Sequence, residues 1–304
     1  MMHPTVYTII VTYNGNKWID KCFGSLTSST IPVKIVAVDN KSTDGTPENI
    51  KQKYPNVQVV ETGQNLGFGK ANNVGIRIAY QNNADYIFLL NQDAWVEKDT
   101  ITNLINTHQK NPSFDLISPL QLNGAGNAID RNFQNYLSPF QTPHILSDAV
   151  LGKLAPIYES SYANAAAWFL TAEAIKQVGG FDPLFKHYGE DDDYINRLHQ
   201  KGLKLAVDTT SIIYHDRPQN GKLHEKFYQN HTYTQALLSV KSTTTPRRHF
   251  LIRRIFVNWI SLMVLSFGKD EEVKRNIKRD VLAIKLMRKA REHKAIQQNT
   301  LAHL

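Results

Sequence analysis

An unbroken run of five apolar residues, Tyr86–Leu90, is followed at once by Asn91, Gln92 and Asp93. Such a run is typical of a strand buried on both faces, and strands of this kind belong to parallel sheets that are covered by helices on both sides. Open sheets bind ligands at the carboxyl ends of their strands. The carboxylate of Asp93 is therefore predicted to lie at a ligand site, although Asp is also a common turn residue.

Strand and helix patterns alternate from the N-terminus to about residue 216. Apolar runs predict strands over residues 6–12, 33–38, 57–60, 86–90 and 115–118, and helical spacing predicts helices over 17–26, 70–80 and 100–109. Residues 167–178 predict a strand and then a helix, 191–200 a helix, and 203–207 and 212–215 short strands. Residues 121–160, rich in Asn, Gly, Ser and Pro, predict long loops that carry specificity. This order predicts an α/β fold with a mainly parallel sheet, right-handed crossovers and helices on both faces.

Charge divides the chain into two parts at about residue 221. Residues 1–221 hold 18 Lys and Arg against 21 Asp and Glu, whereas residues 222–304 hold 17 against 6. The sequence therefore predicts a nearly neutral domain over 1–221 and a basic region over 222–304. A basic region of this kind meets lipid headgroups or nucleic acid, or it forms a solvated helix.

Only helical patterns remain beyond residue 221. Residues 250–267 are apolar at 13 of 18 positions, but Arg253 and Arg254 interrupt them. The uncharged part, 255–267, is shorter than the ~20 residues that span a bilayer. A helix that lies at a membrane surface or docks on the domain is expected instead. Residues 273–294 predict a second, strongly basic amphipathic helix, for which membrane association and a plain packing role both stay open.

The single cysteine, Cys22, excludes a disulfide framework within the chain and fits a reducing compartment. The N-terminus lacks a basic n-region, and its apolar run over residues 6–11 is short, so we expect no signal peptide. These features predict a cytoplasmic protein.

The loops after the first two predicted strands carry polar residues suited to nucleotide recognition. Thr12, Tyr13 and Asn14 follow the first strand, and Asp39 and Asn40 follow the second. Both loops are expected at the same edge of the sheet, where an Asp accepts hydrogen bonds from a base or a ribose. Taken alone, each stretch is also good turn chemistry.

A turn containing Asn65, Gly67 and Lys70 opens the helix predicted over 70–80. Backbone N–H groups at a helix start favour a phosphate. The dinucleotide-binding pattern G-x-G-x-x-G fails here because Asn72 stands at its third glycine, and no Walker A motif is present.

Acidic residues and a histidine occupy three further positions. Asp93 follows the buried strand, residues 190–193 (Glu-Asp-Asp-Asp) begin a predicted helix, and His215 ends the last predicted strand. Such donors suit Mg²⁺ or Mn²⁺, which bind few protein ligands and leave positions for substrate phosphates. Capping and the helix macrodipole explain one or two acids at a helix start, but four are a costly concentration of like charge.

Taken together, these motifs resemble glycosyltransferase family 2, in particular its bacterial rhamnosyltransferase-like members. The resemblance rests on six motifs in order over residues 5–216: Thr12-Tyr13-Asn14, Val38-Asp39-Asn40-Lys41-Ser42-Thr43-Asp44-Gly45-Thr46, Asn65-Leu66-Gly67-Phe68, Asn91-Gln92-Asp93, Gly179-Gly180-Phe181-Asp182 and Gly189-Glu190-Asp191. It implies a GT-A fold, a nucleotide-sugar donor, a divalent metal (Mg or Mn) and inversion at the anomeric carbon.

The resemblance also assigns roles to matching positions. Asp93 matches the last acid of the Asp-x-Asp metal motif, and His215 stands where some members supply another metal ligand. Asp191 matches the catalytic base and is paired with Glu190. Asn91 departs from the pattern, because it replaces the first acid of Asp-x-Asp and leaves one carboxylate for the metal. Donor binding falls to Thr12, Tyr13, Asn14, Asp39, Asn40, Asn65, Gly67, Lys70, Asn91 and Gln92, with Asp39 at the base.

The expected function is an inverting, metal-dependent glycosyltransferase. It would move a sugar from a UDP- or dTDP-linked donor to a hydroxyl of a glycan or lipid-linked acceptor in bacterial surface polysaccharide biosynthesis. The basic tail would hold it at the inner face of the cell membrane.

Two alternatives differ in their sequence requirements. A sugar nucleotidyltransferase usually carries a glycine-rich, basic first loop, which residues 12–16 lack. A non-catalytic nucleotide-binding or nucleic-acid-binding protein fits the basic tail, but base-stacking aromatics are not interleaved with its charges, so no nucleic acid is expected. The intact Asp39, Asp93 and Asp191 argue against a degenerate transferase.

Overall fold

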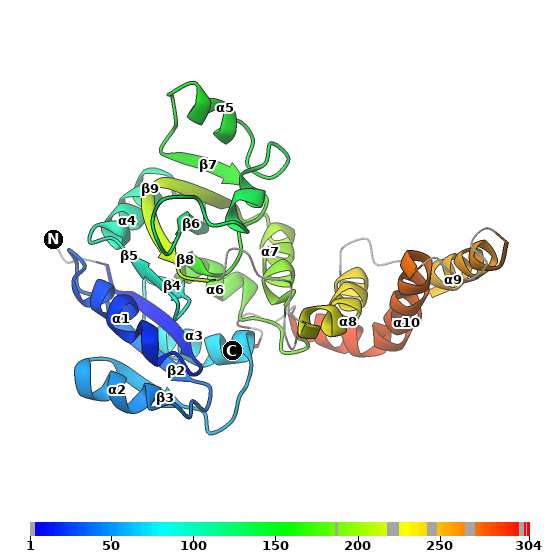
Figure 1. Cartoon of the computed structure of the whole chain (residues 1–304), viewed down its shortest axis with the longest axis horizontal. Coiled ribbons are helices and arrows are strands. Elements are labelled where there is room, and N and C mark those ends of the chain that lie inside the picture. The colour runs from blue at the N-terminus through cyan, green and yellow to red at the C-terminus, as the bar shows by residue number, and fades with distance from the viewer. Residues whose placement is uncertain are drawn as a thin grey trace.

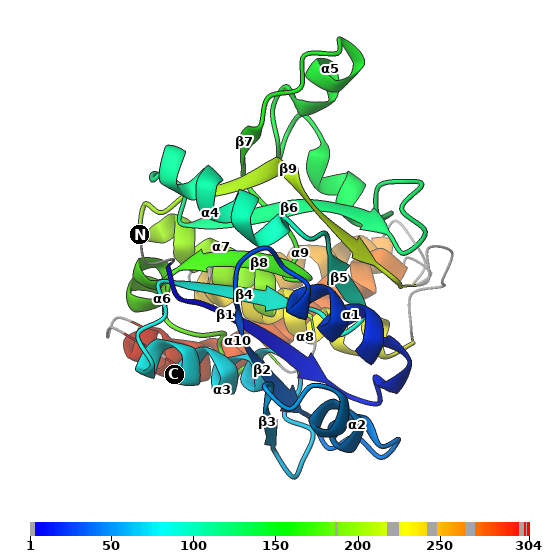
Figure 2. The ribbon, with the colours of Figure 1, turned by 90° about the vertical axis from the view of Figure 1, so that its left-hand side faces the viewer.

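The computed structural model describes residues 4–185, 188–217, 225–241, 248–264, 271–297, 301 and 303–304 (Figure 1). Within them, a nine-stranded sheet carries helices on both faces (Figure 2). The strands are β1 (Val6–Thr12), β2 (Lys34–Asp39), β3 (Gln58–Glu61), β4 (Tyr86–Leu90), β5 (Ala94–Val96), β6 (Leu116–Asn123), β7 (Ile157–Ser160), β8 (Ala167–Thr171) and β9 (Leu205–His215). The helices are η1 (Asn16–Trp18), α1 (Ile19–Thr27), α2 (Thr46–Lys53), α3 (Phe68–Gln81), α4 (Thr100–Lys110), η2 (Phe133–Leu137), α5 (Ile145–Val150), α6 (Ala172–Val178), α7 (Glu190–Gln200), α8 (Glu225–Lys241), α9 (Arg248–Val264) and α10 (Glu271–Gln297).

The first half of the sheet is parallel, as the sequence predicts. Strands β3, β2, β1 and β4 lie side by side in that order, and each neighbouring pair is parallel. Thr12 and Asp39 are register partners at the ends of β1 and β2. The polar turns that follow β1, β2 and β4 therefore begin at one edge of the sheet.

The second half of the sheet is mixed, whereas the sequence predicts a mainly parallel arrangement. Strand β8 runs antiparallel to β4 and β6, and β5 and β7 run antiparallel to β9. Strands β6 and β9 are parallel to each other. All five residues of β8 are buried, and such an apolar run looks the same in either strand direction.

Strand β9 is continuous where the sequence predicts two short strands. Pro119 of β6 pairs with Asp208, and the next residue of β6 pairs with Ile212, so the residues between bulge out of the ladder. The buried Asp208 carboxylate holds the bulge by accepting a hydrogen bond from the Ser211 hydroxyl (2.7 Å). Residues 121–160, predicted as loops, contain the end of β6 together with η2, α5 and β7.

Helices cover both faces of the sheet, as predicted (Figure 2). Helices α1, α2 and α4 pack on one face through residues such as Phe23 and Leu104. Helices α3, α6 and α7 pack on the other through residues such as Ile76 and Tyr194. Full burial of such a side chain stabilises the fold by ~1.5–3 kcal/mol. Because many side chains are buried in this way on both faces, the sheet holds the polar turns at its edge in fixed positions.

Helices α8, α9 and α10 form a helical arm that extends away from the sheet (Figure 1). Helix α8 contacts α7, and α10 contacts both α8 and α9. Leu184 and Phe185 of the domain share one apolar cluster with Leu237 of α8 and Met287 of α10. The helical character predicted beyond residue 221 is confirmed. None of the described helices combines the length and the apolar character that crossing a bilayer requires.

Candidate active site

The ends of β1 and β2 form a polar cluster around Asp39. The buried Asp39 carboxylate accepts hydrogen bonds from Thr12 Oγ1 (2.9 Å) and from the backbone N–H (2.8 Å) and hydroxyl of Ser42. Asn14 joins the cluster, because its N–H donates to Ser42 Oγ (2.9 Å) and its side-chain oxygen accepts from Thr43 N (2.8 Å). Thr12, Asn14 and Asp39 thus lie together, while their donor-binding roles stay predictions.

Gln92 holds the turn after β1. Its Oε1 accepts from Tyr13 N (2.9 Å), and its Nε2 donates to Tyr13 O (3.1 Å). A Cβ atom on Gly15 would overlap Gln92 Oε1, so the glycine makes room for the amide. The Tyr13 side chain is 48% exposed, which leaves its ring available for stacking. Gln92 therefore positions Tyr13 through its main chain.

Two asparagine side chains hold the turn before α3. Asn40 accepts from Leu66 N (3.1 Å) and donates to Gly67 O (3.2 Å), and Asn65 Oδ1 accepts from Gly67 N (2.9 Å). Gly67 has φ = 81°, which suits a residue without Cβ. The sequence predicts that Asn40 and Asn65 bind the nucleotide-sugar donor. In this structure, their side chains form hydrogen bonds that stabilise the turn. Lys70 is exposed on the first turn of α3.

Asp93 and His215 face each other beside Asn91. His215 Nε2 lies 3.3 Å from Asp93 Oδ1 and 3.4 Å from Asn91 Nδ2. His215 is buried, whereas the Asp93 side chain is 20% exposed. Although burial opposes ionisation, the hydrogen bond and the charge of His215 hold the pKa of Asp93 below its usual range. Asp93 therefore presents an ionised carboxylate with access to solvent.

Asp130 and Arg217 lie behind His215. The fully buried Asp130 accepts a hydrogen bond from Arg217 Nε (2.9 Å) at one oxygen and from Arg217 Nη2 at the other. His215 Nδ1 is buried without a hydrogen-bond partner and lies 4.0 Å from Asp130 Oδ2. A carboxylate behind a histidine fixes the ring orientation of a metal ligand. No motif marks Asp130 or Arg217, so sequence reasoning missed both.

The Asp93–His215 pair has the spacing of two adjacent ligands of one divalent cation. Neighbouring ligands of an octahedral ion with ~2.1 Å bonds lie about 3 Å apart. Within the part of the chain that the structure describes, no group of three or more His, Cys, Asp and Glu side chains is arranged to hold a metal ion. A cation bound by this pair takes its other ligands from water and from substrate phosphates.

The four acids at the start of α7 differ in their surroundings. Asp193 is buried and pairs with Arg197 Nε (2.8 Å) and Lys241 Nζ (2.6 Å). Burial and the charge of Asp191 raise the pKa of Glu190 to about 8, and Glu190 Oε2 has no hydrogen-bond partner. Burial also raises the pKa of the partly exposed Asp191. Asp193 therefore serves the fold, whereas Glu190 and Asp191 take no part in these ion pairs and remain candidates for a catalytic role.

Two tyrosines lie next to these acids. Burial and the charge of Asp191 raise the pKa of Tyr136 to about 12, while the charge of Arg217 opposes this shift. The ring centroids of Tyr136 and Tyr162 are 4.8 Å apart, and the Tyr162 hydroxyl faces Asp191. Tyr136 therefore lies within electrostatic range of both Asp191 and the Asp130–Arg217 pair. No sequence pattern singles out either tyrosine.

Residues 7–155 match the model of a family described as Glycosyl transferase family 2. The chain carries a family 2 glycosyltransferase domain. This glycosyltransferase is 26% identical over 250 residues to N-acetylglucosaminyl-diphospho-decaprenol L-rhamnosyltransferase of Mycobacterium tuberculosis, which covers 73% of this chain and 79% of the relative. It is 26% identical over 241 residues to Rhamnosyltransferase WbbL of Escherichia coli, covering 74% and 89%. The resemblance to rhamnosyltransferase-like members is confirmed.

Solved structures share the fold of this glycosyltransferase. TarS 1–349 of S. aureus in complex with UDP-GlcNAc superposes with a TM-score of 0.56 at 17% identity, over 97% of this chain and 84% of that chain. The chain spans 55% of the longer TarS chain. Mannosyltransferase PcManGT from Pyrobaculum calidifontis, in complex with GDP-Man and Mn²⁺, superposes with a TM-score of 0.54 at 16% identity, over 97% and 75%. The expected GT-A fold is confirmed.

Proposed function

We propose that this glycosyltransferase moves a sugar, with inversion, from a nucleoside-diphosphate-sugar to a hydroxyl of a glycan or lipid-linked acceptor. The observation that supports the proposal is the position of three acidic groups, two at or just beyond the carboxyl ends of parallel strands and one at the start of a helix. Asp39 ends β2, Asp93 follows β4, and Asp191 begins α7 next to Tyr136. These three positions supply nucleotide recognition, charge neutralisation and proton removal.

In this proposal, the nucleotide lies over the ends of β1 and β2. Asp39, oriented by Thr12 and Ser42, accepts a hydrogen bond from the base or the ribose. The exposed ring of Tyr13 stacks on the base. The start of α3, with Lys70, faces the diphosphate, because helix N-termini favour anions.

Asp93 and His215 are the residues that hold the divalent ion, Mg or Mn, in this proposal. When bound, such an ion stabilises the negative charge that develops on a leaving diphosphate. Asn91 contributes no carboxylate, so the phosphates of the donor complete the ligand set, and metal and donor bind together. The Mn²⁺ that accompanies GDP-Man in the Pyrobaculum calidifontis neighbour supports a divalent cation in general.

Asp191 accepts the proton of the acceptor hydroxyl as the oxygen attacks the anomeric carbon from the face opposite the leaving group. That carbon becomes oxocarbenium-like as the bond to the diphosphate breaks. Burial raises the pKa of Asp191, and the Tyr162 hydroxyl opposes the shift. Only the ionised carboxylate accepts a proton, so the rate of transfer rises with pH as Asp191 ionises.

The names of the relatives support a sugar and an acceptor class. We propose a rhamnosyl or other hexosyl donor linked to UDP or dTDP, and an acceptor in bacterial surface polysaccharide biosynthesis. Two relatives are named rhamnosyltransferases, one of them for a diphospho-decaprenol-linked saccharide. The solved neighbours hold UDP-GlcNAc and GDP-Man, so one of them supports a UDP-linked donor, and the two differ in sugar and base. Residues 121–160 are proposed to select the acceptor.

A transfer assay with a panel of nucleotide sugars tests this proposal. Asp191→Asn should lower kcat by about 10²–10⁴-fold, the usual contribution of a positioned general base, without a change in Tm. Asp192→Asn removes a neighbouring acid of the same turn and should keep most of the activity. Full transfer by the Asp191→Asn variant would show that the base is another residue. Release of pyrophosphate, in place of a nucleoside diphosphate, would identify a sugar nucleotidyltransferase.

We further propose that residues 1–221 are the catalytic domain and that residues 222–304 hold it at the cytoplasmic face of the cell membrane. The excess of 17 Lys and Arg over 6 Asp and Glu in the second part supports attraction to an anionic surface. Attachment of this kind is peripheral, because it needs no membrane-spanning segment.

A further inference from the structure

Arg217 brings a permanent positive charge to the candidate active site. It follows His215, the last residue of β9, by two positions, and its side chain is 23% exposed, so a ligand can reach it. Its guanidinium group pairs with the fully buried Asp130: Nε lies 2.9 Å from Oδ2, and Nη2 donates to the other oxygen. An arginine stays protonated in proteins, so this charge does not depend on pH or on a bound metal.

The main chain that carries Arg217 is held in place by three neighbours. The N–H of Asp216 donates to the carbonyl oxygen of Asp93 (2.8 Å), and the Asp216 carboxylate accepts from Trp18 Nε1 (2.9 Å). A Cβ atom on Gly124 would overlap the Asp216 side chain, so this glycine allows the chain after β6 to approach. The position of Arg217 is therefore fixed relative to the turn after β4.

Asp130 does more than cap the helical turn that follows it. Its Oδ1 accepts from the N–H groups of Asn132 (3.0 Å) and Phe133 (2.9 Å), at the start of η2. A neutral Asn or Ser side chain would also serve as such a cap. A fully buried carboxylate is costly unless a cation pairs with it. The charge of Asp130 therefore points to a role in holding the guanidinium group of Arg217.

The Asp130–Arg217 pair adjoins the candidate metal ligands. Asp130 Oδ2 lies 4.0 Å from Nδ1 of His215, whose Nε2 faces Asp93 Oδ1 at 3.3 Å. Although burial opposes ionisation, His215 and, to a lesser degree, the charge of Arg217 lower the pKa of Asp93. Burial raises the pKa of Tyr136, and the charge of Arg217 opposes that shift. Arg217 therefore lies within electrostatic range of both Asp93 and Tyr136.

The charge balance of the site explains what a cation is needed for. Asp93 and Asp130 are carboxylates, and a nucleoside diphosphate would add further negative charge beside them. Like charges at short range repel each other, so a diphosphate binds here only with cations next to it. A guanidinium group suits this ligand, because its planar set of N–H donors matches the oxygens of a phosphate.

We propose that Arg217, held by Asp130, donates hydrogen bonds to the β-phosphate of the nucleotide-sugar donor and stabilises the charge that grows on it during transfer. The bond between the anomeric carbon and the β-phosphate oxygen breaks, and its electron pair goes to that oxygen. Arg217 keeps all its protons throughout. The inference rests on the transfer reaction proposed above and makes Arg217 a catalytic residue and Asp130 a positioning residue.

Calorimetric binding of UDP against UMP, and of dTDP against dTMP, tests the contact with the β-phosphate. Wild type should prefer the diphosphate even in EDTA, because Arg217 needs no metal. Arg217→Gln should weaken diphosphate binding by about 10–100-fold, in EDTA and in Mn²⁺ alike, the usual loss for a hydrogen bond to a charged group. It should leave monophosphate binding nearly unchanged. Asp93→Asn should weaken diphosphate binding in Mn²⁺ only.

A second set of variants separates this role from a purely structural ion pair. Arg217→Gln leaves the buried carboxylate of Asp130 without its cation and should lower Tm. The double variant Asp130→Asn, Arg217→Gln removes both charges and should recover Tm but not the affinity for the diphosphate. Arg217→Lys keeps the charge without the planar donors and should bind the diphosphate with intermediate affinity. Recovery of Tm and affinity together in the double variant would overturn the inference.

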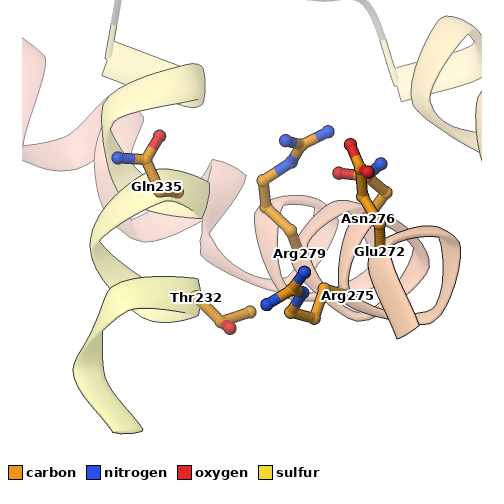
Figure 3. Close-up of a pocket in the computed structure, with 6 residues that line it drawn as sticks. All are labelled: Thr232, Gln235, Glu272, Arg275, Asn276 and Arg279. Carbon is orange, nitrogen blue, oxygen red and sulfur yellow. The ribbon is translucent and has the colours of Figure 1, made fainter. Parts of the chain in front are cut away.

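A matched control removes an arginine from a different part of the chain. Arg275 of α10 lines a cavity of about 320 Å³ and faces Thr232 of α8 across it (Figure 3). This cavity belongs to the helical arm, which extends away from the sheet (Figure 1). Arg275→Gln should therefore leave nucleotide binding and transfer unchanged. A loss of diphosphate affinity equal to that of Arg217→Gln would overturn the inference, because overall charge would then explain both.

Transfer kinetics test the role of Arg217 in the reaction itself. Arg217→Gln should lower kcat by about 10²–10³-fold, the usual cost of removing a donor aimed at developing charge. A loss confined to the KM of the acceptor would place Arg217 at the acceptor and overturn the contact with the donor. A wild type that binds no nucleoside diphosphate would overturn the proposed function as well. A wild type that binds one as tightly as Arg217→Gln does would overturn this inference alone.

Discussion

Lys241, the last residue of α8, forms an ion pair of 2.6 Å with Asp193 of α7. The same ammonium group pairs with Asp182, and all three side chains are buried. Asp193 lies in the turn of α7 that begins with Glu190 and Asp191. The helical arm is therefore attached to the acids of the candidate active site by a buried charge network.

Lys241→Met should lower the free energy of unfolding by about 3–5 kcal/mol, because it leaves two buried carboxylates with fewer partners. Urea unfolding measures the loss. Lys204→Met is the matched control, since it breaks an ion pair with Glu159 whose side chains are 48% and 59% exposed, and it should cost less than about 1 kcal/mol. Similar small losses in both variants would mean that the network contributes little to stability.

Gly189→Ala should perturb both stability and catalysis. Gly189 has φ = 87°, and an added Cβ would overlap Thr234 Cγ2 of α8, whose hydroxyl donates to Tyr188 O (3.2 Å). Gly202→Ala is the control, because Gly202 has a similar φ of 76° but open space around it. The control should cost about 1–2 kcal/mol through backbone strain alone.

The Gly189 variant should cost a further 1–3 kcal/mol or so from overpacking and should lower kcat more than it changes KM. The reason is that the displaced turn carries Glu190 and Asp191. Urea unfolding and steady-state kinetics measure the two effects. If the two glycine variants behave alike, α8 does not hold this turn.

The contribution of Glu190 to stability should fall as pH rises from about 5 to 8. Burial raises the pKa of Glu190 to about 8 from 4.5, so in this window the folded chain keeps a proton that the unfolded chain has released. The loss is at most about 1.4 kcal/mol per pH unit for this group. Glu190→Gln should reduce the slope of unfolding free energy against pH, whereas Glu48→Gln, at an exposed position of α2, should leave it unchanged. Equal slopes in wild type and Glu190→Gln would contradict a raised pKa.

Metal and nucleotide should stabilise the protein together. We expect Mn²⁺ alone to leave Tm unchanged, because Asp93 and His215 supply two ligands only. With a nucleoside diphosphate at 100 times its Kd, binding should add about 2.7 kcal/mol. Asp93→Asn and His215→Ala should each remove the Mn²⁺-dependent part of this gain, measured by thermal shift. Glu97→Gln, which affects an exposed acid bonded to Tyr214, is the control and should retain it.

Local periodicity in the sequence determined most of the longer elements and the first half of the sheet. The buried run Tyr86–Leu90 is a strand, β4, and it lies in one parallel set with β1, β2 and β3, as predicted. These predictions hold because the burial of a strand or of a helix face leaves a pattern within a few residues. Helix α2, which lies between β2 and β3, was not predicted. Asp93, which follows shortly after the run Tyr86–Leu90, also marks one edge of the candidate site.

Only the tertiary structure decided which side chains meet at that edge. The pairing of His215 with Asp93, and of Arg217 with Asp130, joins residues that lie far apart in the sequence. The buried ion pair with Lys241 shows that Asp193, one of the acids that the sequence marks at the start of a helix, has a structural role. The direction of β8 likewise follows from neighbours elsewhere in the chain. A contact between distant residues leaves no period in the sequence, because its free energy depends on positions that the whole fold brings together.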